Sequence, residues 1–453
     1  MNLPDFFLAD LPPEAALTPA MIKSACDTLR QNRERHLAQR STEKIIHALC
    51  EVAGEWLQPD NPFRKFALDR GPAETGFSQP VLERGLDGFF RQFTPEAFQI
   101  LLEQEFGHPE RLDRFVVHGS EEISRRHAIV TAPELLGHIT AGNIPNPALM
   151  SMVLGLLTRS AQFVKCASGD SFLPRLFAHS LYHADPKLGS CLEVAEWQGG
   201  RTKLEDALYS ELDCLTVTGS DEALAAVRAG VPAKVRLVGY GHRVSFGFVT
   251  REVLRQEDIA RVITAAADDI IAWDQNGCLS PHVIYVEERG AVESDKFAEL
   301  LAVELAKRET SEPRGKIPVE AAAAIASRRA IYETIAVHRA DAKIWQSAGS
   351  TAWTVVFEHD TRFQFSCLNR FIYVKPVPDV AAVFQGVDGV RGKVSTVGLV
   401  APPGMSKELA LQFARWGATR ICPLGQMQNP PLTWRHDGRP ALGDLVTWTD
   451  FEL

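Results

Sequence analysis

Hydrophobic residues in the first hundred positions recur at spacings of three and four, the period of a helix with one buried face. The first stripe consists of Met21, Ile22, Ala25, Cys26 and Leu29. It follows Thr18-Pro19, a cap residue and a proline that suit a helix start. Ser41–Leu57 and the segment after Thr94-Pro95 repeat the pattern, whereas Asp60–Thr75, with Pro and Gly, is interpreted as a surface connection. We therefore expect a helical N-terminal region, residues 1–110, packed on the domain that follows.

From about residue 128 the pattern changes to short apolar runs that alternate with helical stretches. Strands are predicted at Leu136–Ala141, Gln162–Cys166, Leu192–Trp197, Leu215–Thr218 and Val235–Val238. Helices are predicted between them at Ala148–Thr158, Ser171–Tyr182 and Asp221–Ala229. Such alternation indicates a parallel sheet covered on both faces, with ligands at the carboxyl ends of its strands. Residues 111–245 are therefore expected to form a first α/β domain.

A second block of alternating elements is predicted over residues 246–394. Its strands are expected at Phe246–Thr250, His282–Val286, Thr354–Phe357 and Phe371–Val374, with an alanine-rich helix at Val319–Tyr332. The final section, residues 395–453, contains a strand, a helix and a strand at Ser395–Val400, Ser406–Trp416 and Thr419–Cys422. Because this alternation of strand and helix resembles that of the first block, we expect the chain to return to the first domain at about residue 395.

Length and composition are those of a two-domain globular protein. The chain has 453 residues, of which 45% are hydrophobic and 23% charged. The net charge of −9 argues against a general nucleic-acid binder, which needs a basic face. The acidic N-terminus is not typical of a secretory signal, and apolar runs are far shorter than the ~20 residues of a spanning helix. The eight cysteines show no CxxC pair or metal-ligand spacing, which favours free thiols, no metal and a cytoplasmic location.

One cysteine stands in a distinctive place. Cys278 lies in the stretch Trp273–Pro281, after a small polar turn with a glycine and before the apolar run His282–Val286. Such a turn can expose a thiol while the strand behind it fixes the position of the sulfur. Considered alone, a cysteine is more often a small buried hydrophobic residue than a nucleophile.

Further candidates follow the predicted strands of the first domain, and each has an ordinary alternative. Asn143 could donate to an oxyanion, or Gly142-Asn143 could be a plain turn. Lys165 could meet a phosphate or ribose, or be solvated. Thr218-Gly219-Ser220 could hold a phosphate on helix N–H groups, or supply an N-cap. Gly239-Tyr240-Gly241 is too short for a full glycine-rich fingerprint.

The order of these segments resembles that of the aldehyde dehydrogenase superfamily. The segments that carry the resemblance are Arg125–Val130 with Gly142-Asn143-Ile144-Pro145, Gln162–Ser168, Thr216–Ser220 and Gly277-Cys278. The first two segments are similar to the superfamily's run from a pair of basic residues to its Asn-aromatic-Pro turn. The third is similar to the strand whose lysine contacts the cofactor ribose, and the fourth to the Phe-Thr-Gly-Ser cofactor turn. Gly277-Cys278 falls where the nucleophile is expected. The resemblance implies an α/β fold with a Rossmann-type cofactor domain and a catalytic domain that carries Cys278. Lys165, Ser168, Thr218, Gly219, Ser220, Gly239 and Gly241 would bind the cofactor.

The closer resemblance is to the acyl-CoA reductase branch, the family of the bioluminescence fatty-acid reductase LuxC. It is carried by Ala141–Pro145, by Cys278-Leu279-Ser280-Pro281, and by His436-Asp437-Gly438 before Leu445-Val446. It covers roughly residues 110–450. It implies reduction of an acyl thioester, from coenzyme A or a carrier protein, to the aldehyde. It also implies a homo-oligomer and a partner protein that transfers acyl groups.

Two departures from the superfamily pattern bear on the chemistry. Val238 falls where hydrolytic aldehyde dehydrogenases have the glutamate that activates water, and valine cannot do so. Ser168 stands where many members have a glutamate that holds the ribose 2′-hydroxyl. Because the missing carboxylate would repel a 2′-phosphate, its absence favours NADPH over NADH. His242 replaces a lysine of the superfamily, and a structural role is the simpler interpretation.

The resemblance implies a mechanism in which the Cys278 thiolate attacks the thioester carbonyl and the carrier thiol leaves. Asn143 and the backbone N–H of Cys278 would hold the oxyanion, and hydride from NADPH would reduce the acyl group to an aldehyde. Two alternatives remain open. One is an aldehyde dehydrogenase that works in the oxidative direction, and the other is a thiol acyltransferase or partner subunit that loads Cys278 without reduction.

Overall fold

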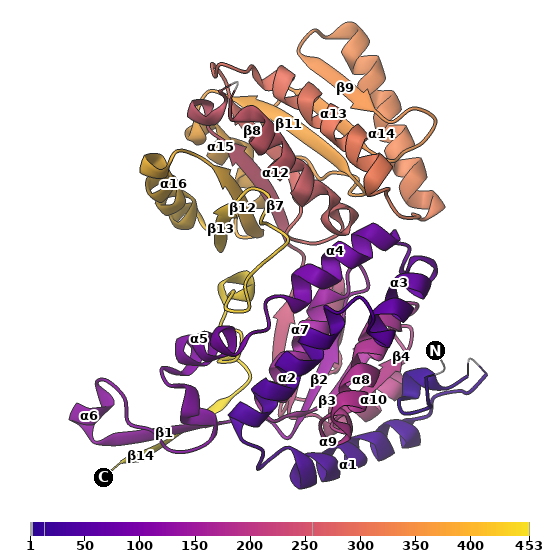
Figure 1. The fold of residues 1–453 in the computed structure, drawn as a ribbon, viewed down its shortest axis with the longest axis vertical. Coiled ribbons are helices and arrows are strands. Elements are labelled where there is room, and N and C mark those ends of the chain that lie inside the picture. Colours follow the sequence, from indigo (N-terminus) through magenta and orange to yellow (C-terminus); the bar gives the residue numbers. More distant parts are fainter. Residues whose placement is uncertain (1–2, 13, 256, 453) are drawn as a thin grey trace. The chain divides into compact units, whose positions relative to one another are not determined.

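The computed structural model describes residues 3–12, 14–255 and 257–452. The chain divides into two compact units. Unit 1 comprises Met1–Thr75, Leu86–Gly241 and Pro431–Leu453, and unit 2 comprises Gly76–Gly85 and His242–Pro430. Each unit contains its own sheet with helices on both faces (Figure 1).

The sheet of unit 1 has five parallel strands in the order β4-β3-β2-β5-β6. They are β2 (Leu135–Ile139), β3 (Ala161–Cys166), β4 (Leu192–Glu196), β5 (Cys214–Thr218) and β6 (Arg236–Tyr240). The connecting helices are α7 (Asn146–Leu157), α8 (Phe172–Ala184), α9 (Pro186–Gly189), α10 (Thr202–Glu211) and α11 (Asp221–Gly230). All six residues of β3 are buried, as expected for a central strand covered on both faces. The predicted parallel α/β sheet is confirmed.

The N-terminal helices follow the predicted stripes. They are α1 (Pro19–His36), α2 (Thr42–Trp56), α3 (Pro62–Thr75), α4 (Gln79–Phe90) and α5 (Pro95–Phe106), followed by the short α6 (Glu121–Ser124). Thr18 and Thr94 cap α1 and α5 through hydrogen bonds from Met21 N and Ala97 N to their hydroxyl oxygens. Buried Ile22, Cys26 and Leu29 of α1 contribute to the same hydrophobic cluster as Phe163 of β3.

The prediction of a surface connection over Asp60–Thr75 is wrong, because Pro62–Thr75 forms helix α3. Its buried residues are Phe63, Arg64, Ala67 and Gly71, which recur at spacings of three and four, so one face of the helix is buried. Pro72 lies in the last part of the helix and lacks only its own N–H bond. Burial of this face outweighs the local signal of the proline and glycine.

The sheet of unit 2 has seven strands in the order β13-β12-β7-β8-β11-β10-β9, and β9 alone among these runs antiparallel. They are β7 (Val244–Val249), β8 (Pro281–Glu287), β9 (Ala342–Gln346), β10 (Thr354–Glu358), β11 (Phe371–Val377), β12 (Val394–Val400) and β13 (Arg420–Pro423). The helices are α12 (Ile259–Ile271), α13 (Ser294–Ser311), α14 (Val319–His338), α15 (Val380–Gly386) and α16 (Pro403–Trp416). Helices α12 and α13 contribute to one hydrophobic cluster and α14, α15 and α16 to another.

The structure corrects the prediction that the chain returns to the first domain at residue 395. Strand β12 pairs with the fully buried β7, and β13 pairs with β12, so both belong to the sheet of unit 2. The chain re-enters unit 1 only at Pro431. A strand–helix–strand pattern has the same appearance in either sheet, so the pattern alone does not assign it to one of them.

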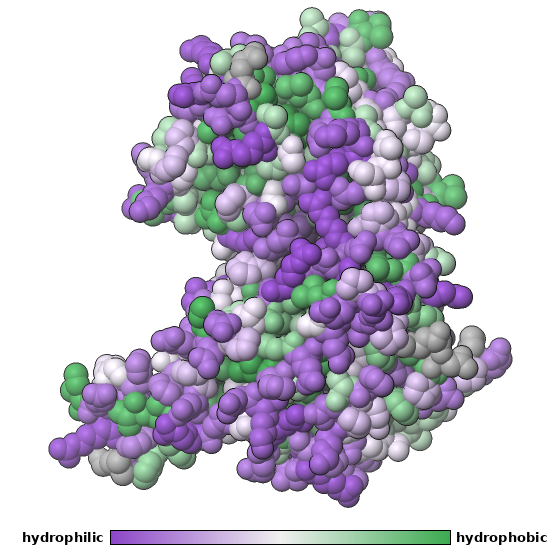
Figure 2. All heavy atoms as spheres, viewed as in Figure 1, coloured by the Kyte–Doolittle hydropathy of each residue, from purple (hydrophilic) through white to green (hydrophobic). Residues whose placement is uncertain are grey.

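The C-terminal strand β14 (Thr447–Glu452) pairs antiparallel with β1 (Arg126–Thr131) in a separate two-stranded sheet (Figure 1). Hydrophilic residues cover most of the face seen in Figure 2, with hydrophobic residues in small groups between them. Within the described parts of the chain, no helix combines the length and apolar character needed to cross a membrane.

Candidate active site

The turn that carries Cys278 begins with an unusual backbone. After α12, the three residues Trp273, Asp274 and Gln275 have φ values of 52°, 48° and 65°. Residues other than glycine rarely adopt this left-handed region, at a cost of about 1–3 kcal/mol each. The conformation therefore requires surrounding contacts that hold it.

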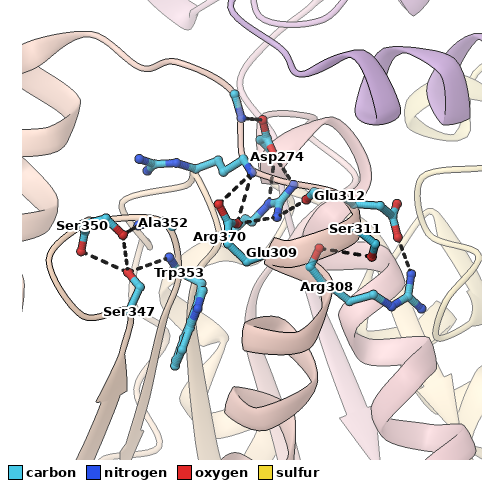
Figure 3. A network of polar contacts seen from close by, with 12 residues as sticks. Asp274, Arg308, Glu309, Ser311, Glu312, Ser347, Ser350, Ala352, Trp353 and Arg370 are labelled. Carbon is cyan, nitrogen blue, oxygen red and sulfur yellow. Dashed lines mark hydrogen bonds and ion pairs between the residues drawn. The ribbon is translucent and has the colours of Figure 1, made fainter.

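A buried ion pair supplies one such contact. Arg370 Nε donates to Asp274 Oδ1 at 2.8 Å, and the N–H of Gly315 donates to Asp274 Oδ2 at 3.0 Å. Arg370 also donates to Glu309 at 3.1 Å and to the carbonyl of Glu312 at 2.8 Å (Figure 3). Asp274 is 2% and Arg370 1% exposed. Burial raises the pKa of Asp274, and the adjacent guanidinium opposes this shift.

The segment that carries Arg370 has a left-handed backbone too. Leu368, Asn369 and Arg370 have φ values of 55°, 54° and 65°. The side chain of Gln275 joins the two segments, because its Nε2 donates to the carbonyls of Phe371 at 2.9 Å and Pro281 at 2.7 Å. The turn before Cys278 is thus fixed from the start of β11.

Cys278 itself is half-buried, between buried Gln275 and buried Ser280. Its carbonyl accepts a hydrogen bond from Ser245 Oγ of β7 at 2.8 Å. The N–H of Ser280 donates to the carbonyl of Gly277 at 3.0 Å and closes the turn. The backbone is therefore rigidly placed, while the residue as a whole is partly exposed.

The other cysteines are poor candidates for a nucleophile. Burial raises the pKa of Cys26, Cys166, Cys191 and Cys422 to about 12 and that of Cys50 and Cys214 to about 11. Burial also raises the pKa of Cys367. Because the thiolate is the reactive form, these seven thiols are expected to be weakly reactive at neutral pH.

Two histidines lie near the start of β8. The N–H of Ser366 donates to His282 Nδ1 at 3.1 Å, which leaves the ring proton of the neutral form on Nε2. Burial, with a smaller contribution from nearby His242, lowers the pKa of His282 to about 4. The rings of His242 and His282 each lie 5.9 Å from Phe365, centroid to centroid. His282 was not among the residues that the sequence pattern predicts, because a histidine in an apolar run carries no distinguishing signal.

In unit 1, Gly142 and Asn143 form the exposed bend between β2 and α7. A Cβ at position 142 would collide with Oδ2 of Asp170, so a larger residue there would have to displace the Asp170 side chain. Burial raises the pKa of Asp170 to about 6, and Glu196 adds to the shift.

Lys165 near the end of β3 is 7% exposed, so the alternative of a solvated lysine is wrong. Its Nζ lies 5.8 Å from the centroid of the Trp197 ring, and burial lowers its pKa. Ser168 is exposed in the loop that follows. The next N–H, of Gly169, donates to Glu196 Oε1 at 2.7 Å. A carboxylate from β4 is therefore present beside the loop in which the superfamily glutamate is missing.

The turn after β5 is an N-cap, as one alternative predicts. Ser220 Oγ accepts from the N–H of Ala223 at 3.2 Å, and Asp221 and Glu222 follow in the first turn of α11. A Cβ at Gly239 would lie 2.9 Å from Leu224, and one at Gly241 would lie 2.6 Å from Asp221 Oδ1. These two glycines let the start of α11 lie close to the end of β6.

The other sequence-predicted positions have structural roles. Val238 is buried in a small cluster with Leu136, Cys214 and Leu445. The ring of His436, in the tail motif, stacks on Tyr240 at the end of β6 with 4.3 Å between centroids.

The family profile described as acyl-CoA reductase (LuxC) matches residues 37–448. The chain belongs to the LuxC acyl-CoA reductase family. It is similar to the long-chain acyl-protein thioester reductase of Aliivibrio fischeri, with 23% identity over 423 residues, 90% of this chain and 82% of that one. The corresponding protein of Photorhabdus laumondii is 24% identical over 319 residues, 70% of this chain. The match spans 63% of that relative, less than two thirds of its length.

Solved structures show the same fold at lower identity. The aldehyde dehydrogenase of Brucella melitensis biovar abortus 2308 superimposes with a TM-score of 0.69 at 14% identity, over 96% of this chain and 90% of that one. The predicted aldehyde-dehydrogenase-like fold is confirmed.

Proposed function

We propose that this protein reduces an acyl thioester to the corresponding aldehyde, with Cys278 as the acyl carrier. The observation that carries the proposal is the half-buried thiol on a turn whose backbone is fixed by Ser245 and by the Asp274–Arg370 pair. Membership of the acyl-CoA reductase family supports it. A partly exposed cysteine on a rigid turn suits a nucleophile, because the approach of its sulfur to a carbonyl is set in advance.

The acyl transfer proceeds by exchange of one thioester for another. The Sγ of Cys278 forms a bond to the acyl carbon, the bond from that carbon to the carrier sulfur breaks, and the carrier thiol leaves with a proton. The backbone N–H of Cys278 and the amide of Asn143 are the proposed donors to the developing oxyanion. The aldehyde leaves when the bond from carbon to Cys278 Sγ breaks and the thiol is restored.

A nicotinamide cofactor fits unit 1, and we propose NADPH in preference to NADH. When bound, it supplies the hydride that converts the acyl group to the aldehyde level. Lys165 is a buried cation at the carboxyl end of a parallel strand, where such folds bind nucleotides. Ser168 offers a hydroxyl in place of a carboxylate to a ribose 2′-phosphate. Thr218, Gly219, Ser220, Gly239 and Gly241 are the remaining proposed cofactor contacts.

The substrate is proposed to be a long-chain acyl group on coenzyme A or on a carrier protein. The names of the relatives, acyl-protein thioester reductases, support a protein-bound thioester and a partner that delivers it. A homo-oligomer is part of the same proposal.

The test is a panel of acyl-CoA and acyl-carrier thioesters assayed by loss of NADPH, with the aldehyde trapped as product. Cys278→Ala should abolish both covalent acylation and NADPH oxidation, and turnover by this variant would overturn the proposal. Acid formation from aldehyde and NADP⁺ without a thiol acceptor would establish an oxidative aldehyde dehydrogenase instead. Acylated Cys278 without NADPH loss would establish an acyltransferase.

A further inference from the structure

A buried carboxylate fixes the backbone of the segment that follows β13. Asp269 of α12 accepts hydrogen bonds from the N–H groups of Gly425 and Met427, the latter at 2.9 Å. Asp269 is 1% exposed, and burial raises its pKa to about 7 while these N–H groups oppose the shift. Removing this carboxylate would leave buried N–H groups without acceptors, which would destabilise the segment. Asp269 therefore fixes the course of the chain up to Gln428.

The side chain of Gln428 contacts both ends of the Cys278 turn. Its Nε2 donates to Ser280 Oγ, and both groups are buried. A Cβ at Gly277 would lie 2.7 Å from both Nε2 and Oε1 of Gln428, so the amide lies directly against the glycine. The space lined by Asp269, Gln428, Gly425 and Trp273 holds about 20 Å³, which admits one water at most. The Gln428 amide therefore packs against the turn with little room beside it.

The turn that Gln428 contacts determines the direction of the Cys278 N–H. The carbonyl of Gly277 points into the turn, where it accepts from the N–H of Ser280 at 3.0 Å. The peptide between Gly277 and Cys278 is trans, so its N–H points opposite to its carbonyl. The N–H of Cys278 is therefore directed out of the turn. On the other side of the residue, Ser245 Oγ holds the Cys278 carbonyl and itself accepts from the N–H of Thr396 at 3.1 Å.

We propose that Gln428 is a positioning residue for acyl transfer: it holds the Gly277–Cys278 peptide so that the Cys278 N–H serves the oxyanion, and Asp269 holds Gln428. The inference rests on the proposed function and adds two positioning residues to it. It separates two properties of Cys278. The reactivity of the sulfur depends on the thiol, whereas stabilisation of the oxyanion depends on the peptide that Gln428 holds.

Two reactions of the protein distinguish these properties. Alkylation of Cys278 by iodoacetamide needs no oxyanion donor, whereas release of coenzyme A in a single turnover with acyl-CoA, without NADPH, does. In Gln428→Ala the rate of release should fall about tenfold to a hundredfold, below the 10²–10³ lost when a donor is removed outright. The alkylation rate and its pH profile should stay within about threefold. Gln428→Met, which keeps the length of the side chain, should show the same split if the alanine variant does not fold.

Gln346→Ala is the matched control, because Gln346 lies on β9 at the other edge of the same sheet. It should change neither rate. Two results would overturn the positioning role alone. One is that the alkylation rate and the rate of coenzyme A release fall in parallel in Gln428→Ala and Gln428→Met, and the other is that neither rate falls. Wild-type protein that alkylates at Cys278 but releases no coenzyme A would overturn the proposed function and the positioning role with it.

Discussion

Arg370 Nε lies 2.8 Å from Asp274 Oδ1, and both residues have a left-handed backbone. The ion pair joins two strained tripeptides, residues 273–275 and 368–370, in the interior of unit 2. Strain of this kind persists only where the surroundings determine it, and it is frequent at functional sites. Here it directly precedes Cys278, which ties the stability of unit 2 to the geometry of the proposed nucleophile.

Breaking this pair is expected to destabilise the protein. In Asp274→Asn the buried Arg370 guanidinium would lose one of its two carboxylate partners and keep Glu309, so the free energy of unfolding should fall by about 3 kcal/mol, the lower end for a broken buried pair. Urea unfolding measures the change. The matched control is Asp341→Asn, which breaks a solvent-exposed pair with Arg339 and should leave the free energy of unfolding nearly unchanged. Equal losses in the two variants would contradict a structural role for the buried pair.

Cofactor choice should respond to the carboxylates around Ser168. Ser168→Glu would add a negative charge beside Glu196 and Asp170, so NADPH affinity should fall more than NADH affinity. Glu196→Gln should do the reverse, because it removes a charge that repels a 2′-phosphate. Equilibrium binding of the two nucleotides, followed by protein fluorescence, gives both dissociation constants. Ser210→Glu, on α10, is the control, and an unchanged ratio in Ser168→Glu would remove the argument for NADPH.

The strands of both sheets are largely predictable, because parallel strands covered on both faces are short apolar runs such as Gln162–Cys166. The Cys278 turn is predictable as well, since Gly277 and Pro281 bracket it in sequence. Helix α3 is not, because its proline and glycine give a local loop signal that burial of one face overrides. The assignment of β12 to unit 2 depends on its pairing with β7. The two strands lie far apart in sequence: Thr396 of β12, whose N–H donates to Ser245 Oγ of β7, follows Ser245 by 151 residues.

The support of the candidate site is hidden from sequence for a similar reason. Gln428 is 148 residues from Ser280, and Ser245 is 33 residues from Cys278. Neither residue type has a distinctive chemistry, so tertiary structure alone gives them a role. The left-handed backbone at Trp273 and Gln275 carries no sequence signal either, because such conformations are expected at glycine or asparagine. The reactive residue is thus visible in sequence, and the residues that orient it are not.

Selective labelling should identify Cys278 among the eight cysteines. With a small excess of iodoacetamide at pH 7.5, Cys278 should be alkylated first, because burial raises the pKa of each of the other seven thiols. Peptide mapping by mass spectrometry gives the order of labelling. In Cys278→Ala the first alkylation of the native protein should be about tenfold slower than in the wild type, because the seven remaining thiols are present mainly in protonated form. Faster labelling of a fully buried cysteine such as Cys166 would contradict this order.

Acid should destabilise unit 1 through a buried histidine in its sheet. His138 of β2 contacts Thr216 at 2.6 Å through Nδ1 and Gln162 Oε1 at 2.8 Å through Nε2. Because Gln162 Nε2 donates to the carbonyl of Met152, its Oε1 faces the histidine as an acceptor. The proton therefore resides on Nε2, and Nδ1 accepts from the threonine hydroxyl. Burial lowers the pKa of His138 from 6.5 to about 4.

The sign of the pH dependence follows from this shift. Between pH 6.5 and 4 the unfolded chain binds a proton at His138 that the folded protein does not, so stability falls as the pH is lowered. The full contribution is on the order of 3 kcal/mol, present above pH 6.5 and lost on approach to pH 4. His138→Gln should therefore flatten the plot of unfolding free energy against pH by about 1.4 kcal/mol per pH unit in this window. His47→Gln, at a site with an 80% exposed side chain, should leave the plot unchanged, and a wild-type slope in His138→Gln would refute the assignment.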